Sequence, residues 1–74
     1  MKNITNIFVF RTNINTLRDK LAVKEVLGAH PGIEEWSVDL QDCDKVLRVV
    51  TPGNSAHEII NLIKETGYEC HELE

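Results

Sequence analysis

Apolar and polar positions follow two different periods along this chain, and the switches between the two periods mark out its elements. Residues 4–11, ITNIFVFR, are rich in β-branched and aromatic types, which predicts a strand. Apolar and polar residues alternate in IEEWSVDL, residues 33–40, which predicts a half-buried strand. VLRVVT at residues 46–51 predicts the next strand, and YECHEL at residues 68–73 predicts a short final one.

Two stretches with helical spacing lie between these strands. In the first, residues 16–30, the apolar residues near helical spacing are Leu17, Val23, Val26 and Leu27. GAHPG should end this helix, because glycine accepts left-handed angles and proline cannot continue the helix. The second, SAHEIINLIKET at residues 55–66, starts with the S-x-x-E spacing of a capping box. Its apolar stripe predicts a helix that packs on a core, with Gly67 as its C-terminal stop.

The element order β-α-β-β-α-β predicts one α+β domain over residues 1–74, a ferredoxin-like sandwich. We expect a four-stranded antiparallel sheet in the order 4-1-3-2, with both helices on one face. Residues 12–19, 41–45 and 67–71 should meet at one edge of the sandwich. Trp36, on the inner side of its strand, is expected to be largely buried over the end of the first helix.

Charge and hydropathy narrow the possible functions. The chain carries 12 acidic and 8 basic residues, a net charge of −4, so it lacks the basic face that nucleic-acid binding needs. No apolar run is long enough to span a membrane. The first residues, MKNITN, are polar and do not resemble a signal peptide, so a cytoplasmic location is the default expectation.

Several segments taken together resemble heavy-metal-associated (HMA) domains, the small modules of copper chaperones and metal ATPases. VKEVL is similar to the core of the first helix of that family, and HPGIEEWSVDL to its second strand. IINLIKETGYEC is similar to its second helix and last strand. The resemblance covers nearly the whole chain and implies the same ferredoxin-like fold.

The metal-binding motif of the family, M-x-C-x-x-C, falls on Ile14, Thr16 and Asp19 in this chain. Both cysteines are therefore replaced, and a hydroxyl and a carboxylate are hard ligands where Cu(I) selects soft sulfur. Thr16 and Asp19 instead have the spacing of a helix capping box, with aspartate in place of glutamate. A carboxylate site for a hard cation is the alternative, although one acid beside two asparagines offers few ligands.

Three other residues could ligate a metal ion. Cys70 takes a position usually filled by a small aliphatic residue and is expected to pack in the core. Cys43, between two aspartates, is expected to be an exposed hairpin residue of low reactivity. His71 follows Cys70 directly, so the two side chains should point to opposite faces of their strand. Strands 3 and 4 are not adjacent in the predicted order, which argues against a shared metal site or a disulfide.

Two surfaces could contact a partner protein. Ile14, Leu17 and Tyr68 could form a small apolar tip at the edge where residues 12–19, 41–45 and 67–71 meet, or they could simply pack within the loop. On the open face of the sheet we expect an apolar patch around one arginine, formed by Ile7, Val9, Val46, Arg48 and Val50. Such a patch could close a homodimer, or it could be a partly apolar solvated sheet.

Two functional interpretations follow. The first is a non-catalytic interaction or adaptor module that keeps the HMA fold without its CxxC site, and hence without a cofactor. The second is a metallochaperone that carries copper or zinc on non-standard ligands, drawn from Cys43, Cys70, His71 or Asp19 and completed within one chain or between subunits. A small-molecule sensor is a third possibility with no supporting motif. Neither nucleic acid nor membrane is an expected partner.

Overall fold

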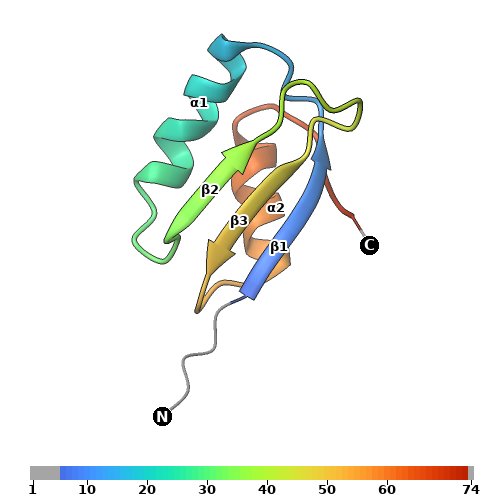
Figure 1. The fold of residues 1–74 in the computed structure, drawn as a ribbon. Coiled ribbons are helices and arrows are strands. Elements are labelled where there is room, and N and C mark those ends of the chain that lie inside the picture. The colour runs from blue at the N-terminus through green and yellow to red at the C-terminus, as the bar shows by residue number, and fades with distance from the viewer. Residues whose placement is uncertain (1–5, 74) are drawn as a thin grey trace.

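The computed structural model describes residues 6–73 and has two layers, a four-stranded sheet and two helices that cover one of its faces (Figure 1). The strands are β1 (Asn6–Thr12), β2 (Glu35–Val38), β3 (Leu47–Thr51) and β4 (Cys70–Glu72). The helices are α1 (Leu17–Gly28) and α2 (Ala56–Glu65). Residues 4 and 5 of the predicted first strand lie outside the described residues.

The sheet order is β2-β3-β1-β4, and every neighbouring pair is antiparallel, as predicted. Val9 pairs with Arg48 between β1 and β3, and Arg11 pairs with His71 between β1 and β4. Because side chains alternate along a strand, this register turns Phe8 and Phe10 toward the helices and Ile7 and Val9 away from them.

One core lies between the sheet and the helices. Its fully buried side chains include Phe10, Ile14, Val23, Leu27, Leu47, Val49, Ile59, Ile63 and Cys70. Removal of the apolar surface of this set from water is the main stabilising term for so short a chain. Both α1 and α2 contribute two fully buried residues, which confirms Val23, Leu27, Ile59 and Ile63 as core positions.

The first helix and its surroundings depart from the prediction in three respects. Leu17, counted among the apolar residues at helical spacing, is 69% exposed, and Leu21, which the prediction does not name, is 58% exposed. Gly28 ends the helix without left-handed angles; Gly67, after α2, is the described glycine with a positive φ, of 97°. Trp36 lies on the inner side of β2 as expected, yet it is only partly buried and packs at the margin of the core.

The predicted convergence at one edge is confirmed by hydrogen bonds between segments far apart in the sequence. Thr12 N donates to Asp44 O at 3.1 Å, and Thr12 Oγ1 donates to Lys45 O at 2.6 Å. Glu69 N donates to Asn13 Oδ1 at 2.9 Å. The end of β1, the β2–β3 hairpin and the α2–β4 turn are therefore tied together where α1 begins (Figure 1).

Candidate functional site

The entrance to α1 is a complete capping box. Asp19 N donates to Thr16 Oγ1 at 3.1 Å, and Thr16 N donates to Asp19 Oδ2 at 3.2 Å. Asn15 N donates to the same Asp19 oxygen at 3.1 Å. Thr16 and Asp19 thus satisfy backbone N–H groups that the first turn of a helix leaves without partners. The predicted structural cap is confirmed.

Tyr68 completes the set of hydrogen bonds around the Asp19 carboxylate. Its hydroxyl, from the turn after α2, donates to Asp19 Oδ1 at 2.7 Å. This bond, together with those from the Asn15 and Thr16 amides, lowers the pKa of Asp19 below its usual value. The same bond raises the pKa of the Tyr68 hydroxyl. Asp19 is therefore held as a carboxylate, and both its oxygens already accept hydrogen bonds.

Of the two alternatives for Ile14, an apolar tip or packing within the loop, the structure shows packing. The Ile14 side chain is fully buried in the core, and its amide donates to Thr12 Oγ1 at 3.2 Å. The loop before α1 is therefore held in place by the buried Ile14 side chain and by this hydrogen bond. Of the three predicted tip residues, Leu17 is exposed and Tyr68 is half-buried with its hydroxyl on Asp19. An apolar tip made of all three residues does not exist.

The entrance to α2 repeats this arrangement and shows a pattern that the sequence prediction lacks. The segments 12–19 and 51–58 both read T-x-x-N-[TS]-x-x-[DE]. Each begins with a buried threonine at the end of a strand, Thr12 or Thr51, whose hydroxyl donates to a loop carbonyl at 2.6 Å. Each ends in a capping box, with both reciprocal bonds formed by Ser55 and Glu58 at α2. Comparison of the two β-α units at the sequence level is the signal that could have found this repeat.

The β2–β3 hairpin holds the second group of potential ligands. One ligand atom from each of Asp42, Cys43 and Asp44 lies within 4.8 Å of the others, and Cys43 is exposed. Asp42 Oδ1 accepts from Asp44 N at 2.8 Å, a bond that shapes the turn. Within residues 6–73 this is the one group of three such side chains, and the D-C-D run itself is the available signal. The sequence prediction names Cys43 alone as the potential ligand here.

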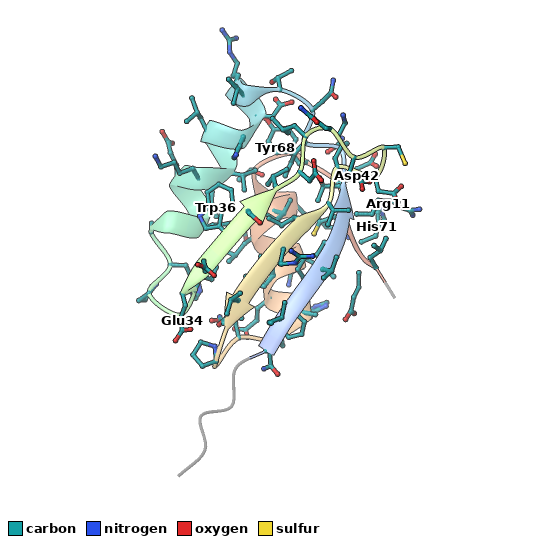
Figure 2. All side chains as sticks on the ribbon, in the orientation of Figure 1. Arg11, Glu34, Trp36, Asp42, Tyr68 and His71 are labelled. Atoms are coloured by element: carbon teal, nitrogen blue, oxygen red, sulfur yellow. The ribbon has the colours of Figure 1, made fainter. Side chains whose placement is uncertain are left out.

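Cys70 and His71 do not join that group. Cys70 is buried in the core, and burial raises the pKa of its thiol to about 12. His71 is exposed and follows Cys70 on the opposite side of β4. Both cysteines are free thiols, as predicted. Within the described residues, the one group of three potential ligands contains Cys43 but not Cys70, His71 or Asp19. Figure 2 labels Asp42, of that group, and His71.

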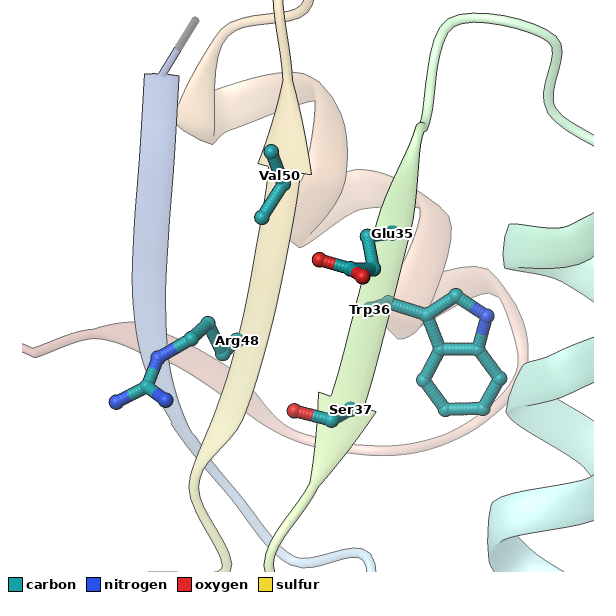
Figure 3. Close-up of a pocket in the computed structure, with 5 residues that line it drawn as sticks. All are labelled: Glu35, Trp36, Ser37, Arg48 and Val50. Carbon is teal, nitrogen blue, oxygen red and sulfur yellow. The ribbon is translucent and has the colours of Figure 1, made fainter.

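The open face of the sheet has the predicted composition and one residue more. Ile7 is 64% exposed, and Val9, Val46 and Val50 are partly exposed around Arg48. Leu73, which follows β4, is 37% exposed and lines a shallow hollow with Val9. A second hollow of about 310 Å³ lies between β2 and β3, where Glu35, Ser37, Arg48 and Val50 face outward while Trp36 turns toward α1 (Figure 3).

Comparison with solved structures shows the fold of HMA domains. The chain superposes on "the apo form of HMA domain of copper chaperone for superoxide dismutase" with a TM-score of 0.78 and 20% identity, over 100% of this chain and 74% of the other. For oxidized MerP from Ralstonia metallidurans the TM-score is 0.80 at 12% identity, over 95% and 99% of the two chains. For a putative copper-ion-binding protein from Bacillus anthracis it is 0.78 at 15% identity, over 95% and 100%.

No protein-family model matches the sequence, and no curated protein matches it. The likeness is thus one of fold, with the similar structures described as metal chaperone, transport and metal-ion-binding domains. Among the described residues, no helix has the length and apolar character needed to cross a membrane.

The side chains at the entrance to α1 are poor ligands for Cu(I), the ion named for two of the similar solved structures. Thr16 and Asp19, on which the HMA motif falls in the resemblance given above, offer oxygens, which are hard donors. Thr16 Oγ1 accepts from Asp19 N, and the Asp19 oxygens accept from two amides and one phenol. A metal ion on Thr16 Oγ1 or Asp19 Oδ2 would compete with the capping bonds, and one on Asp19 Oδ1 would compete with the Tyr68 hydroxyl.

Proposed function

We propose that this chain is a non-catalytic HMA-type domain whose two-thiolate metal site has been replaced by a helix cap, and that it acts by binding another protein. The observation that carries the proposal is the set of three hydrogen bonds accepted by the Asp19 carboxylate. The repeat of the same cap at α2 supports it, because it gives Thr16 and Asp19 a sufficient structural role.

The decisive experiment is an anaerobic Cu(I) titration against a competing chelator. The parent chain should not retain Cu(I), whereas the double variant Thr16→Cys, Asp19→Cys should bind one ion per chain. The matched control is Ser55→Cys, Glu58→Cys, which places two cysteines at the same positions of the repeated pattern at α2. Cu(I) binding by the α1 variant alone would locate the lost site. Tight binding of one Cu(I) by the parent would overturn the proposal.

The competing function is a metal carrier with non-standard ligands. The observation that favours it is the Asp42, Cys43 and Asp44 group at the same edge as the α1 entrance. Its cargo would be zinc or copper, since a thiolate between carboxylates suits a borderline or soft ion. Titration of the reduced parent and of Cys43→Ser with Zn(II) and Cu(I) tests this function. Metal retention by the parent that Cys43→Ser abolishes would establish it, and retention that Cys70→Ser abolishes would point to Cys70.

For the protein partner we propose contact at the exposed Leu17 of the α1 entrance, or on the open face of the sheet. The open face joins apolar side chains to Arg48, a combination typical of interface centres. A homodimer through the open face is an alternative use of that surface. Ile7→Ser would disrupt the open-face contact with a different protein as well as the open-face homodimer. A cytoplasmic location stays a prediction; the two free thiols are consistent with a reducing compartment.

A further inference from the structure

A groove runs between α1 and the edge strand β2, on the helix side of the sheet. Its volume is about 450 Å³, and its walls are Leu17, Lys20, Leu21, Lys24, Trp36 and Ser37. Leu17 and Leu21 are one helical turn apart and are the most exposed large apolar side chains of α1. With the partly exposed indole of Trp36 they form an apolar patch that the core does not cover.

The strand beside this groove has one free side. Within residues 6–73, β2 pairs with β3 alone, so it is an edge of the described sheet. Asp39 N donates to Val46 O, and backbone groups alternate in direction along an antiparallel strand. The N–H and C=O groups of Trp36 and Val38 therefore point away from β3, toward the open side. Such a row of unpaired backbone N–H and C=O groups can form hydrogen bonds with a further strand.

The charges along this edge are arranged in two opposite groups. Lys20 and Lys24 line the groove on α1, and Glu34 directly precedes β2 (Figure 2 labels Glu34 and Trp36). α1 and β2 run in opposite directions (Figure 1), so Glu34 lies at the end of the groove that is far from Lys20. A two-fold axis near Trp36 would exchange these ends and bring Glu34 of one copy to Lys20 of the other.

We propose that two copies of this chain associate through the β2 edge and the α1–β2 groove. The β2 strands pair antiparallel and join the two sheets into one continuous sheet. The two α1 helices then lie side by side, so that Leu17, Leu21 and Trp36 of each copy cover those of the other. The contact is isologous, because each copy supplies both the basic groove and the acidic strand start.

The opposite edge of the sheet lacks these features. β4 has three residues, and the side chains around its free edge include the exposed Glu69 and Glu72. A second copy would meet like charges there. The α1–β2 edge is therefore the edge whose apolar, charged and backbone groups are complementary to themselves.

The size of the proposed interface sets the expected affinity of the dimer. A standard interface covers about 800 Å² per partner, roughly one sixth of the 5038 Å² of accessible surface of this chain. Three apolar side chains form only the centre of such an interface. We therefore place the dimer at the weak end of the scale, with a Kd of roughly 1–100 μM. Such association does not depend on whether the chain binds a metal.

Sedimentation equilibrium over a wide concentration range tests the proposal directly. The parent should reach a dimer, and Leu21→Ser should raise the dimer Kd at least about tenfold. The matched control is Ile7→Ser, which removes a similarly exposed apolar side chain from the open face. Its Kd should stay within about threefold of the parent. A parent that stays monomeric at millimolar concentration, or a dimer broken by Ile7→Ser but not by Leu21→Ser, would overturn the proposal.

A charge exchange provides the second test, with charged residues outside the buried core. Lys20→Glu with Lys24→Glu should weaken the dimer, because the Glu34 side chain of the other copy then meets like charge. Addition of Glu34→Lys should restore the Kd to within about threefold of the parent. Trp36 is the single tryptophan, so its fluorescence on dilution reports the same equilibrium. If the triple variant is no tighter than the double variant, the two-fold arrangement is wrong.

Discussion

The entrances to α1 and α2 have the same construction but differ in what else is attached to them. Both follow a buried threonine, and both close with two reciprocal hydrogen bonds between residues three apart. At α1 the Tyr68 hydroxyl also binds the capping acid, across 49 residues of sequence. Within the part of the chain that the structure describes, the capping acid of α2 has no such bond from a distant turn.

This difference bears on the proposal that a ligand position has become a structural one. The side chains of Thr16 and Asp19 turn back onto the backbone and accept its hydrogen bonds. Once Asp19 accepts from two amides and from Tyr68, the loop is tied to both the helix and the α2–β4 turn. The α1 entrance thus has the same cap as the α2 entrance and one further bond to a distant turn.

The largest expected difference between the entrances lies at the second residue before each cap. Ile14 is fully buried, whereas Gly53, its counterpart in the repeat, is exposed, and a methyl group added there would meet only open space. Ile14→Ala should lower the free energy of unfolding by about 2–4 kcal/mol through lost apolar contact and a cavity. Gly53→Ala should change it by less than about 1 kcal/mol. Urea denaturation measures both, and equal losses would contradict the burial of Ile14.

Removal of the cap hydroxyls should affect the two entrances alike. Thr16→Ala and Ser55→Ala each delete the acceptor for one helix amide, at a cost of about 1 kcal/mol each. Because the caps are far apart, the double variant should lose the sum of the two. Thr16→Ser and Ser55→Thr, which keep the hydroxyl, are the controls for urea denaturation. A Thr16→Ala variant as stable as the parent would show that the Thr16 hydroxyl does not stabilise the helix as a cap.

Acid should weaken both entrances in the same pH range. The pKa values of Asp19 and Glu58 are lowered by the hydrogen bonds each carboxylate accepts, Asp19 chiefly from Tyr68 and Glu58 chiefly from Ser55. A lowered folded-state pKa gives stability that is present above the unfolded pKa and is lost as pH falls through the folded one. The free energy of unfolding should therefore fall below about pH 4, near the unfolded pKa values. Asp19→Asn and Glu58→Gln should each flatten that fall in urea denaturation followed against pH.

The smallest change separates the entrances most cleanly. Tyr68→Phe removes only the hydroxyl that binds Asp19. The pKa of Asp19 should then rise toward its usual value, while the pKa of Glu58 stays as in the parent. Carboxyl chemical shifts followed by NMR against pH resolve the two residues. An unchanged Asp19 pKa would mean that the amides of Asn15 and Thr16 alone hold the carboxylate.

The fold and the caps can be predicted because they depend on local patterns. The alternation around Trp36 and the spacing Ser55-x-x-Glu58 each report the state of their own segment. The Tyr68–Asp19 bond cannot be predicted in this way, since its two residues belong to different β-α-β units. Helical spacing alone does not predict the exposure of Leu17 and Leu21, because α1 carries leucines on two adjacent sides and the spacing does not say which side meets the sheet. Only the alternative of an apolar tip places Leu17 at the surface.

For Ile14 the sequence leaves two alternatives open, an exposed tip and packing within the loop, and the structure shows the second. The sequence cannot choose between them, because the inward turn of the loop between Thr12 and Thr16 depends on contacts with segments far away in the sequence. The hairpin group escapes notice when Cys43 is considered singly, because it is the turn that folds Asp42 and Asp44 around it.

The burial of Cys70 has a consequence for how the motion of this protein can be followed. Its thiol lies under β4, the three-residue strand at the end of the sheet, while Cys43 stands in solvent. An alkylating reagent can reach Cys70 only when β4 and the adjacent turn detach, and it then traps that open state. Cys43 reacts first because it is exposed. The rate at which Cys70 then reacts measures how often β4 detaches from the native chain.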